Sequence, residues 1–147
     1  MEEAHRWILV VEDNLDDERL ATRTLKKSGR VERMHVARDG EEALAMLKEK
    51  QPPALMLLDL KLPRLSGMDV LTAVREDDRL RTLPIVVLTS SNEQSDVAAC
   101  FELGCNAFVR KSIGFEDYVR ELGTTLSFWL DINCPPPIEP PVVSAVS

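Results

Sequence analysis

Carboxylates, a hydroxyl and a lysine stand at the ends of short apolar runs in this sequence. Glu12 and Asp13 follow the first run, and Asp59 ends another. Thr89 and Lys111 end two later runs. Three carboxylates held close together repel one another and tend to stay protonated. A hard divalent cation such as Mg²⁺ removes that penalty, because it prefers oxygen ligands.

This set of side chains suits phosphoryl transfer to a carboxylate. With a cation bound, one carboxylate can attack phosphorus and form an aspartyl phosphate. The transferred group then carries negative charge spread over its equatorial oxygens. The Lys111 ammonium can neutralise part of that charge, and the Thr89 hydroxyl can donate a hydrogen bond to it. Asp59 is the best candidate for the nucleophile, because its strand is expected to be central and a loop follows it directly.

The chemistry requires elements that bring these strand ends to one edge. Apolar runs predict five strands, over 7–11, 33–37, 54–59, 84–89 and 106–111. Amphipathic stretches between and after them predict five helices, over 15–28, 39–49, from Gly67 onward, near 94–104 and over 115–131. Strands that alternate with helices and are apolar throughout indicate a parallel sheet covered on both faces. We therefore expect a doubly wound, flavodoxin-like (βα)5 sandwich, whose ligands bind at the carboxyl ends of the strands.

Two helices have ends or faces that the pattern predicts in detail. Asn14 or Asp16 is expected to cap the helix that starts near 15, and Asp16 and Asp17 are expected to be solvated residues of its first turn. The last helix carries an apolar stripe that is expected to face the core, with Phe128 off the stripe and exposed. The residues of this stripe are Phe115, Tyr118, Val119, Leu122, Leu126, Trp129 and Leu130.

The other helices are also expected to turn apolar side chains inward. In the helix near 94–104 these are Val97, Ala98 and Phe101. In the helix after Gly67 they are Val70, Leu71 and Val74.

Length and composition limit the possible functions. A chain of 147 residues suits one domain, expected over 1–131, followed by a proline-rich tail over 132–147. The net charge of −7 argues against binding to nucleic acid or to an anionic membrane. The three cysteines match no zinc pattern or disulfide framework, and no signal peptide or membrane-length apolar run is present, so a cytoplasmic location is expected.

Four segments together resemble the receiver domain of two-component response regulators: "ILVVEDN", "LMLLDLKLPRLSG", "PIVVLTS" and "AFVRK". The resemblance covers roughly residues 6 to 130. It implies that Asp59 is the phospho-acceptor. It also implies that Asp13 binds Mg²⁺ directly, that Glu12 acts largely through water, and that the backbone carbonyl of Lys61 completes the ligands.

The same resemblance implies roles for the remaining strand-end residues and for a partner. Thr89 would be the switch hydroxyl, Lys111 would pair with the phosphate, and Phe108 would be the aromatic that turns inward when Thr89 moves. The phosphoryl donor would be a phosphohistidine on a sensor histidine kinase. The chain would act on itself, taking up and later hydrolysing the acyl phosphate, and would not be an enzyme with a separate substrate.

A narrower resemblance is to single-domain regulators paired with phytochrome-type histidine kinases. It rests on "VEDNLDDERL", "DGEEAL", "RKS" and "FWLDINCPPP". It implies signalling downstream of a photoreceptor kinase. It also implies a homodimer formed through the fifth strand and the face of the last helix. No room is expected for an output domain after residue 131, so output would pass through protein contacts.

The sequence departs from the receiver pattern at three places. Ser112 follows Lys111 where most receivers have proline after a cis peptide, and a cis bond to serine costs about 2.5–4 kcal/mol. The bond is therefore either trans, with a rearranged loop, or strained. Phe108 stands where many receivers have tyrosine, so a switch there can rely only on packing. Lys61 adds a positive charge beside the acceptor, and we expect it to alter phosphate lifetime.

Two other functions compete with a phosphorylated receiver. One is a receiver-like interaction module that takes no phosphate, which the complete set of acidic, Thr and Lys residues disfavours. The other is a Mg²⁺-dependent phosphatase with an aspartyl intermediate. Such enzymes usually carry a second aspartate two places after the nucleophile, where this chain has Lys61.

Overall fold

The computed structural model describes residues 6–29 and 33–136. The described strands are β1 (Ile8–Val11), β2 (Met34–Ala37), β3 (Leu55–Leu58), β4 (Ile85–Thr89) and β5 (Ala107–Arg110). The α-helices are α1 (Leu15–Lys27), α2 (Gly40–Glu49), α3 (Gly67–Glu76), α4 (Gln94–Leu103) and α5 (Phe115–Ser127). A 3-10 turn, η3 (Asp78–Leu80), follows α3, and a π-helical turn, η4 (Phe128–Ile132), follows α5.

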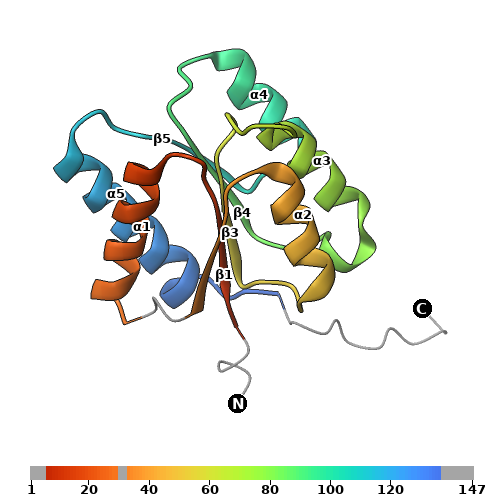
Figure 1. The fold of residues 1–147 in the computed structure, drawn as a ribbon, viewed down its shortest axis with the longest axis horizontal. Coiled ribbons are helices and arrows are strands. Elements are labelled where there is room, and N and C mark those ends of the chain that lie inside the picture. Colours follow the sequence, from red (N-terminus) through yellow and green to blue (C-terminus); the bar gives the residue numbers. More distant parts are fainter. Residues whose placement is uncertain (1–5, 30–32, 137–147) are drawn as a thin grey trace.

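The described strands form one parallel sheet in the order β2-β1-β3-β4-β5, which confirms the predicted doubly wound fold. Figure 1 shows α1 and α5 on one face of the sheet and α2, α3 and α4 on the other. β3 is the central strand, as predicted for the strand that precedes Asp59. The strand order reverses between β1 and β3, and this switch point is where open α/β sheets bind ligands.

The core consists of two apolar layers separated by the sheet. Alternate residues of a strand point to opposite faces, so each buried strand contributes to both layers. On the face of α2, α3 and α4 the strands contribute Leu9, Val11, Met56, Leu58, Ile85 and Val87. On the face of α1 and α5 they contribute Ile8, Val10, Leu55, Leu57, Val86 and Leu88. The two apolar layers explain why β1 and β3 are apolar along their whole length and why β4 is apolar up to Thr89.

The inward faces of α3 and α4 were predicted with different success. Val70, Leu71 and Val74 of α3 are buried, as predicted. In α4 the prediction was wrong for Ala98 and Phe101, which are exposed, whereas Val97 is half-buried and Cys100 is the buried residue. Cys100 belongs to the core layer of α2, α3 and α4, whereas the Phe101 ring is 50% exposed.

The stripe on the last helix is also shorter than predicted. Tyr118, Leu122 and Leu126 are buried, but Phe115 is exposed. Phe115 is the first residue of α5 and lies on the surface, with the Arg23 guanidinium of α1 6.0 Å from its ring centroid. A cation over an aromatic face stabilises such a partly solvated ring.

The end of the last helix differs from the predicted end at 131. Regular α5 stops at Ser127, and the chain continues as the π-helical turn η4. The Asn133 N–H closes this turn by donating to the Phe128 carbonyl at 2.7 Å. Phe128 is exposed, as predicted. His5 and most of the proline-rich tail lie outside the described residues, and the division at 131 stays a prediction.

Candidate functional site

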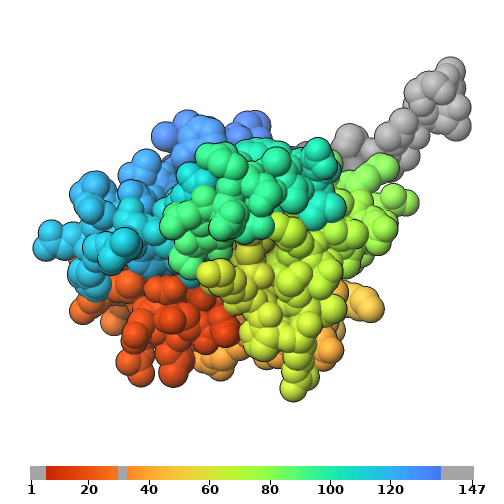
Figure 2. All heavy atoms as spheres, turned by 90° about the horizontal axis from the view of Figure 1, so that it is seen from above, coloured from red at the N-terminus to blue at the C-terminus, as the bar shows by residue number. Residues whose placement is uncertain are grey.

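Backbone hydrogen bonds beyond the strand ends hold the predicted site residues at one edge of the sheet. The Glu12 N–H donates to the Ala37 carbonyl at 2.9 Å, and the Asp59 N–H donates to the Val11 carbonyl at 3.1 Å. The Lys111 N–H donates to the Thr89 carbonyl at 2.7 Å. Each residue thus extends the ladder by one position, so its side chain is fixed by the sheet. Figure 2 looks onto this edge, where the red, yellow-green and blue-green parts of the chain meet.

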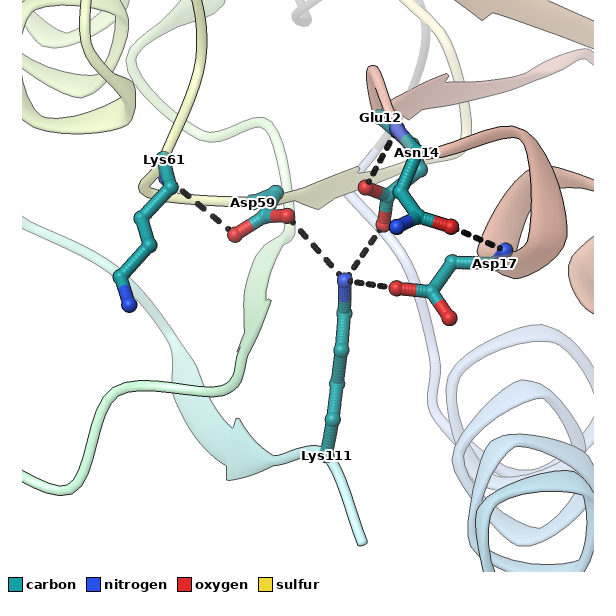
Figure 3. A network of polar contacts seen from close by, with 6 residues as sticks. All are labelled: Glu12, Asn14, Asp17, Asp59, Lys61 and Lys111. Carbon is teal, nitrogen blue, oxygen red and sulfur yellow. Dashed lines mark hydrogen bonds and ion pairs between the residues drawn. The ribbon is translucent and has the colours of Figure 1, made fainter. Parts of the chain in front are cut away.

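Lys111 lies at the centre of the site. Its Nζ is 2.6 Å from Glu12 Oε1, 2.8 Å from Asp17 Oδ2 and 3.1 Å from Asp59 Oδ2 (Figure 3). An ammonium has three N–H donors, and here each has a carboxylate acceptor. The Lys111 side chain is only 9% exposed, so these charge-assisted bonds are screened less than those on the surface. The structure therefore brings Lys111 and the carboxylates together, and the predicted pairing of Lys111 with a phosphate stays a prediction.

Glu12, Asp13 and Asp59 form an acidic cluster, defined here as these three residues, that could hold a metal ion. One carboxylate oxygen from each lies within 4.8 Å of the others. Glu12 and Asp59 are buried, and Asp13 is exposed. An all-oxygen, negatively charged set of this kind fits a hard divalent cation. The Lys61 N–H donates to Asp59 Oδ1 at 3.2 Å, and the role of the Lys61 carbonyl stays a prediction.

Burial and neighbouring charges act in opposite senses on two groups of the site, and the net pKa shift is upward for both Glu12 and Lys111. Burial raises the pKa of Glu12 to about 7, although the Lys111 ammonium lowers it. Burial lowers the pKa of Lys111, but hydrogen bonds with Asp17 and Glu12 raise it more, so its net shift is upward. Lys111 therefore stays protonated and supplies a fixed positive charge to the site.

Thr89 and Phe108, the two predicted switch residues, both lie near this edge. Thr89 ends β4 and is completely buried, and its Oγ1 has no hydrogen-bond partner among the residues that the structure describes. Buried hydroxyls are nearly always paired, so an unpaired one at a site edge indicates a group poised for another acceptor. Phe108 is half-buried on β5 and packs against the core layer of α2, α3 and α4.

The prediction that Asp16 and Asp17 are both solvated residues of the first turn is wrong for Asp17. Its side chain is 26% exposed and binds Lys111 at 2.8 Å. Asn14 caps α1, as predicted, and its Oδ1 accepts from the Asp17 N–H at 3.0 Å. No local pattern in the sequence indicated this contact, because acidic residues are common in the first turn of a helix.

Tyr118 is a second residue whose place at the site was not predicted beyond core packing. It lines a cavity of about 10 Å³ together with Glu12, Asp17 and Asp59. Burial raises the pKa of Tyr118, and the nearby carboxylates act in the same direction although Lys111 opposes them. The phenol therefore stays protonated beneath the carboxylates.

The loop after Lys111 has a trans backbone, which decides between the two alternatives left open by Ser112. No cis peptide occurs in the described part of the chain. The Ser112 hydroxyl bonds to the Glu121 carboxylate, with Oγ 2.7 Å from Oε1 and 2.8 Å from Oε2. This contact ties the residue after Lys111 to α5.

Comparison with known proteins agrees with the fold. The model of the response regulator receiver domain matches residues 8–122. Response regulator Rcp1 of Synechocystis sp. is 38% identical over 130 residues, which are 84% of this chain and 88% of that protein.

Two solved structures have the same fold as this chain. The structure of the Mn²⁺-bound form of Rcp1 has a TM-score of 0.83 at 35% identity, covering 90% of this chain and 99% of that one. The phosphorylated cyanobacterial phytochrome response regulator RcpA has a TM-score of 0.85 at 32% identity, with the same coverage. The family model, the sequence relative and these structures agree, and this chain belongs to the response regulator receiver family.

Proposed function

We propose that Asp59 accepts a phosphoryl group from a sensor histidine kinase in a Mg²⁺-dependent reaction, and that the chain signals by changing its protein contacts. The observation that carries this proposal is the placement of the Asp59 carboxylate. It is buried at the switch point of the sheet, 3.1 Å from a lysine ammonium and within 4.8 Å of two more carboxylates. Two buried carboxylates beside an exposed third are more typical of a functional site than of a structural one.

Each residue of the site has a part in this transfer. An Asp59 oxygen attacks the phosphorus, the new O–P bond forms, and the N–P bond to the donor imidazole breaks, with the electron pair leaving on the imidazole nitrogen. Lys111 stabilises the negative charge on the transferred group, and the Thr89 hydroxyl donates to one of its oxygens.

The acidic cluster and the Lys61 carbonyl would hold the Mg²⁺ ion. When bound, the ion would neutralise charge on the carboxylates and on the phosphoryl oxygens. The donor set supports this assignment, because carboxylate and carbonyl oxygens are the ligands that Mg²⁺ prefers. The Mn²⁺-bound form of Rcp1 is a relative with a divalent ion.

Phe108 would transmit the phosphorylated state by packing. Once the Thr89 hydroxyl turns toward the phosphoryl group, the ring of Phe108 could move further into the core layer that it already contacts. Because phenylalanine has no hydroxyl, this switch depends on volume alone.

A phytochrome-type kinase is the proposed upstream partner. The support is the similarity to RcpA, which is a cyanobacterial phytochrome response regulator. Two exposed apolar side chains are compatible with docking of a kinase beside the site. Leu15 starts α1 and is 53% exposed, and Ile113 lies in the loop after Lys111 and is fully exposed. None of the helices in the described ranges is long and apolar enough to cross a membrane.

The test is phosphorylation of the purified chain by acetyl phosphate with Mg²⁺. We expect intact mass spectrometry to show one added phosphoryl group on the wild type and none on Asp59→Asn. Asp78→Asn is the matched control, because Asp78 is an exposed residue of η3 that pairs with Arg81. Removal of Mg²⁺ with a chelator should also abolish the adduct.

Two results would reject the proposal. No adduct from acetyl phosphate or from any phosphorylated kinase would favour the interaction module that takes no phosphate. Steady turnover of an unrelated phosphate ester would favour the phosphatase.

A further inference from the structure

Asp17 is the one carboxylate bound to Lys111 that does not belong to the acidic cluster. Lys111 contacts Glu12, Asp17 and Asp59, and two of these three residues are also candidate metal ligands. A cation or a phosphoryl group would therefore compete with Lys111 for Glu12 and Asp59. The bond between Lys111 and Asp17 would stay intact in either case.

Both ends of the contact between Asp17 and Lys111 are anchored in the fold. Asp17 lies in the first turn of α1, where its N–H donates to the capping side chain of Asn14 at 3.0 Å. Lys111 is anchored by its N–H bond to Thr89, and the next residue, Ser112, is held by Glu121 of α5. The 2.8 Å contact thus joins two elements that are 94 positions apart in the sequence.

We propose that Asp17 is a positioning residue that holds the Lys111 ammonium at the acceptor throughout the phosphorylation cycle. This inference rests on the proposed function. When Asp59 carries a phosphoryl group, Asp17 keeps the ammonium beside the new oxygens without taking a cation ligand. In the resting protein, Asp17 satisfies one of the three N–H donors, so Lys111 competes less strongly with the cation for Glu12 and Asp59.

Removal of the Asp17 charge should therefore slow phosphorylation of Asp59, because the Lys111 ammonium is no longer held at the acceptor. We expect Asp17→Asn to lower the rate of phosphorylation by acetyl phosphate at fixed Mg²⁺ about tenfold, which is the effect of losing one partly exposed, charge-assisted hydrogen bond. Asp17→Glu keeps the charge and should recover most of the rate. Asp16→Asn is the matched control, since Asp16 is an exposed aspartate of the same helical turn and does not contact Lys111.

A double-mutant cycle separates positioning from a general effect on the fold. If Asp17 acts through Lys111, Asp17→Asn should have no further effect on the rate in a Lys111→Ala background. A merely structural role would lower the rate in both backgrounds. Equal rates for Asp17→Asn and the wild type, or effects that add in the double variant, would overturn the proposal.

A second readout does not depend on phosphorylation. In protein that contains isotopically labelled lysine, Asp17→Asn should shift the NMR resonance of the Lys111 ammonium, and Asp16→Asn should leave it in place. An unmoved resonance in Asp17→Asn also overturns the proposal. A wild type that takes no phosphate but shows this shift would reject the proposed function and retain the contact between Asp17 and Lys111.

Discussion

Glu12 combines deep burial with a charge that the site needs. Its side chain is 5% exposed and lies 2.6 Å from the Lys111 ammonium. Burial disfavours the ionised carboxylate, and the ammonium compensates for this only in part, so the pKa of Glu12 rises from 4.5 to about 7. A proton and a cation therefore compete for the same oxygens near neutral pH.

This competition predicts that Mg²⁺ affinity depends on pH. A cation binds the deprotonated carboxylate, so the affinity should fall as pH is lowered through about 7 and approach about tenfold per pH unit below it. Above that pH the affinity should level off, because the carboxylate is already ionised. Isothermal titration calorimetry across this range measures the change. Glu12→Gln should bind more weakly and lose most of the dependence, and a wild type with a flat profile would contradict the prediction.

Sequence reasoning identified the strand-end residues and missed Asp17, for a physical reason. Glu12 and Asp59 follow apolar strands directly, Thr89 ends β4 and Lys111 follows β5. A parallel sheet must bring such strand ends together. Asp17 is one turn into a helix, where acidic residues are common because they suit the helix dipole. Its contact with Lys111 depends on the packing of α1 against the sheet, which no local pattern contains.

At the scale of elements, the position of α3 against the end of β3 shapes the acceptor loop. Gly67 starts α3, and its N–H donates to the Leu60 carbonyl at 2.9 Å. A Cβ built on Gly67 would lie 2.3 Å from the Asp59 carbonyl oxygen and 2.6 Å from the Leu60 Cα. These are backbone atoms that cannot rotate away. The close approach of helix and strand therefore requires glycine.

Alanine substitutions at two glycines should have opposite effects on stability. Gly67→Ala forces α3 away from the acceptor loop and should lower the free energy of unfolding by about 1–3 kcal/mol, as overpacking does. Gly123 lies inside α5, where a Cβ would meet only the Thr24 Cγ2 at 3.9 Å. Gly123→Ala should raise stability by about 0.5–1 kcal/mol, because alanine is the better helix former. Urea denaturation measures both.

Gly67→Ala should also slow phosphorylation of Asp59, since the clash falls on the Asp59 backbone itself. Gly123→Ala should leave the rate unchanged. If Gly67→Ala proved as stable and as active as the wild type, the close packing of α3 on the acceptor loop would be wrong.

Which side of a helix faces the core, and where a helix changes its form, was harder to predict than the order of strands and helices. The order of strands and helices follows from apolar runs and amphipathic stretches, which are long signals. Which side of α4 faces the core depends on one residue, and Cys100 took the place expected for Phe101. The change from α5 to η4 at Phe128 had no signal in the apolar pattern, which continues through Trp129 and Leu130.

At the scale of the whole molecule, four of the six exposed large apolar residues in the described ranges form two groups with different expected partners. Leu15 and Ile113 are exposed and lie two positions after Asp13 and Lys111, respectively. Phe128 and Ile132 lie at the other end of the last helix, in η4. β5 is also an edge strand, so it has an unpaired side. Exposed apolar side chains on an edge commonly mark protein interfaces.

Substitutions in the two groups should separate dimerisation from phosphotransfer. If the chain forms a homodimer through β5 and the last-helix face, sedimentation velocity should show a dimer for the wild type and mostly monomer for Phe128→Asp, because a buried, unpaired charge is costly. Leu15→Asp is the matched control, with the same charge introduced at a similarly exposed site. It should remain dimeric but accept phosphate more slowly from a kinase, while its reaction with acetyl phosphate is unchanged. A monomeric wild type would rule out the proposed homodimer. A Phe128→Asp variant that stays dimeric would show that the interface lies elsewhere.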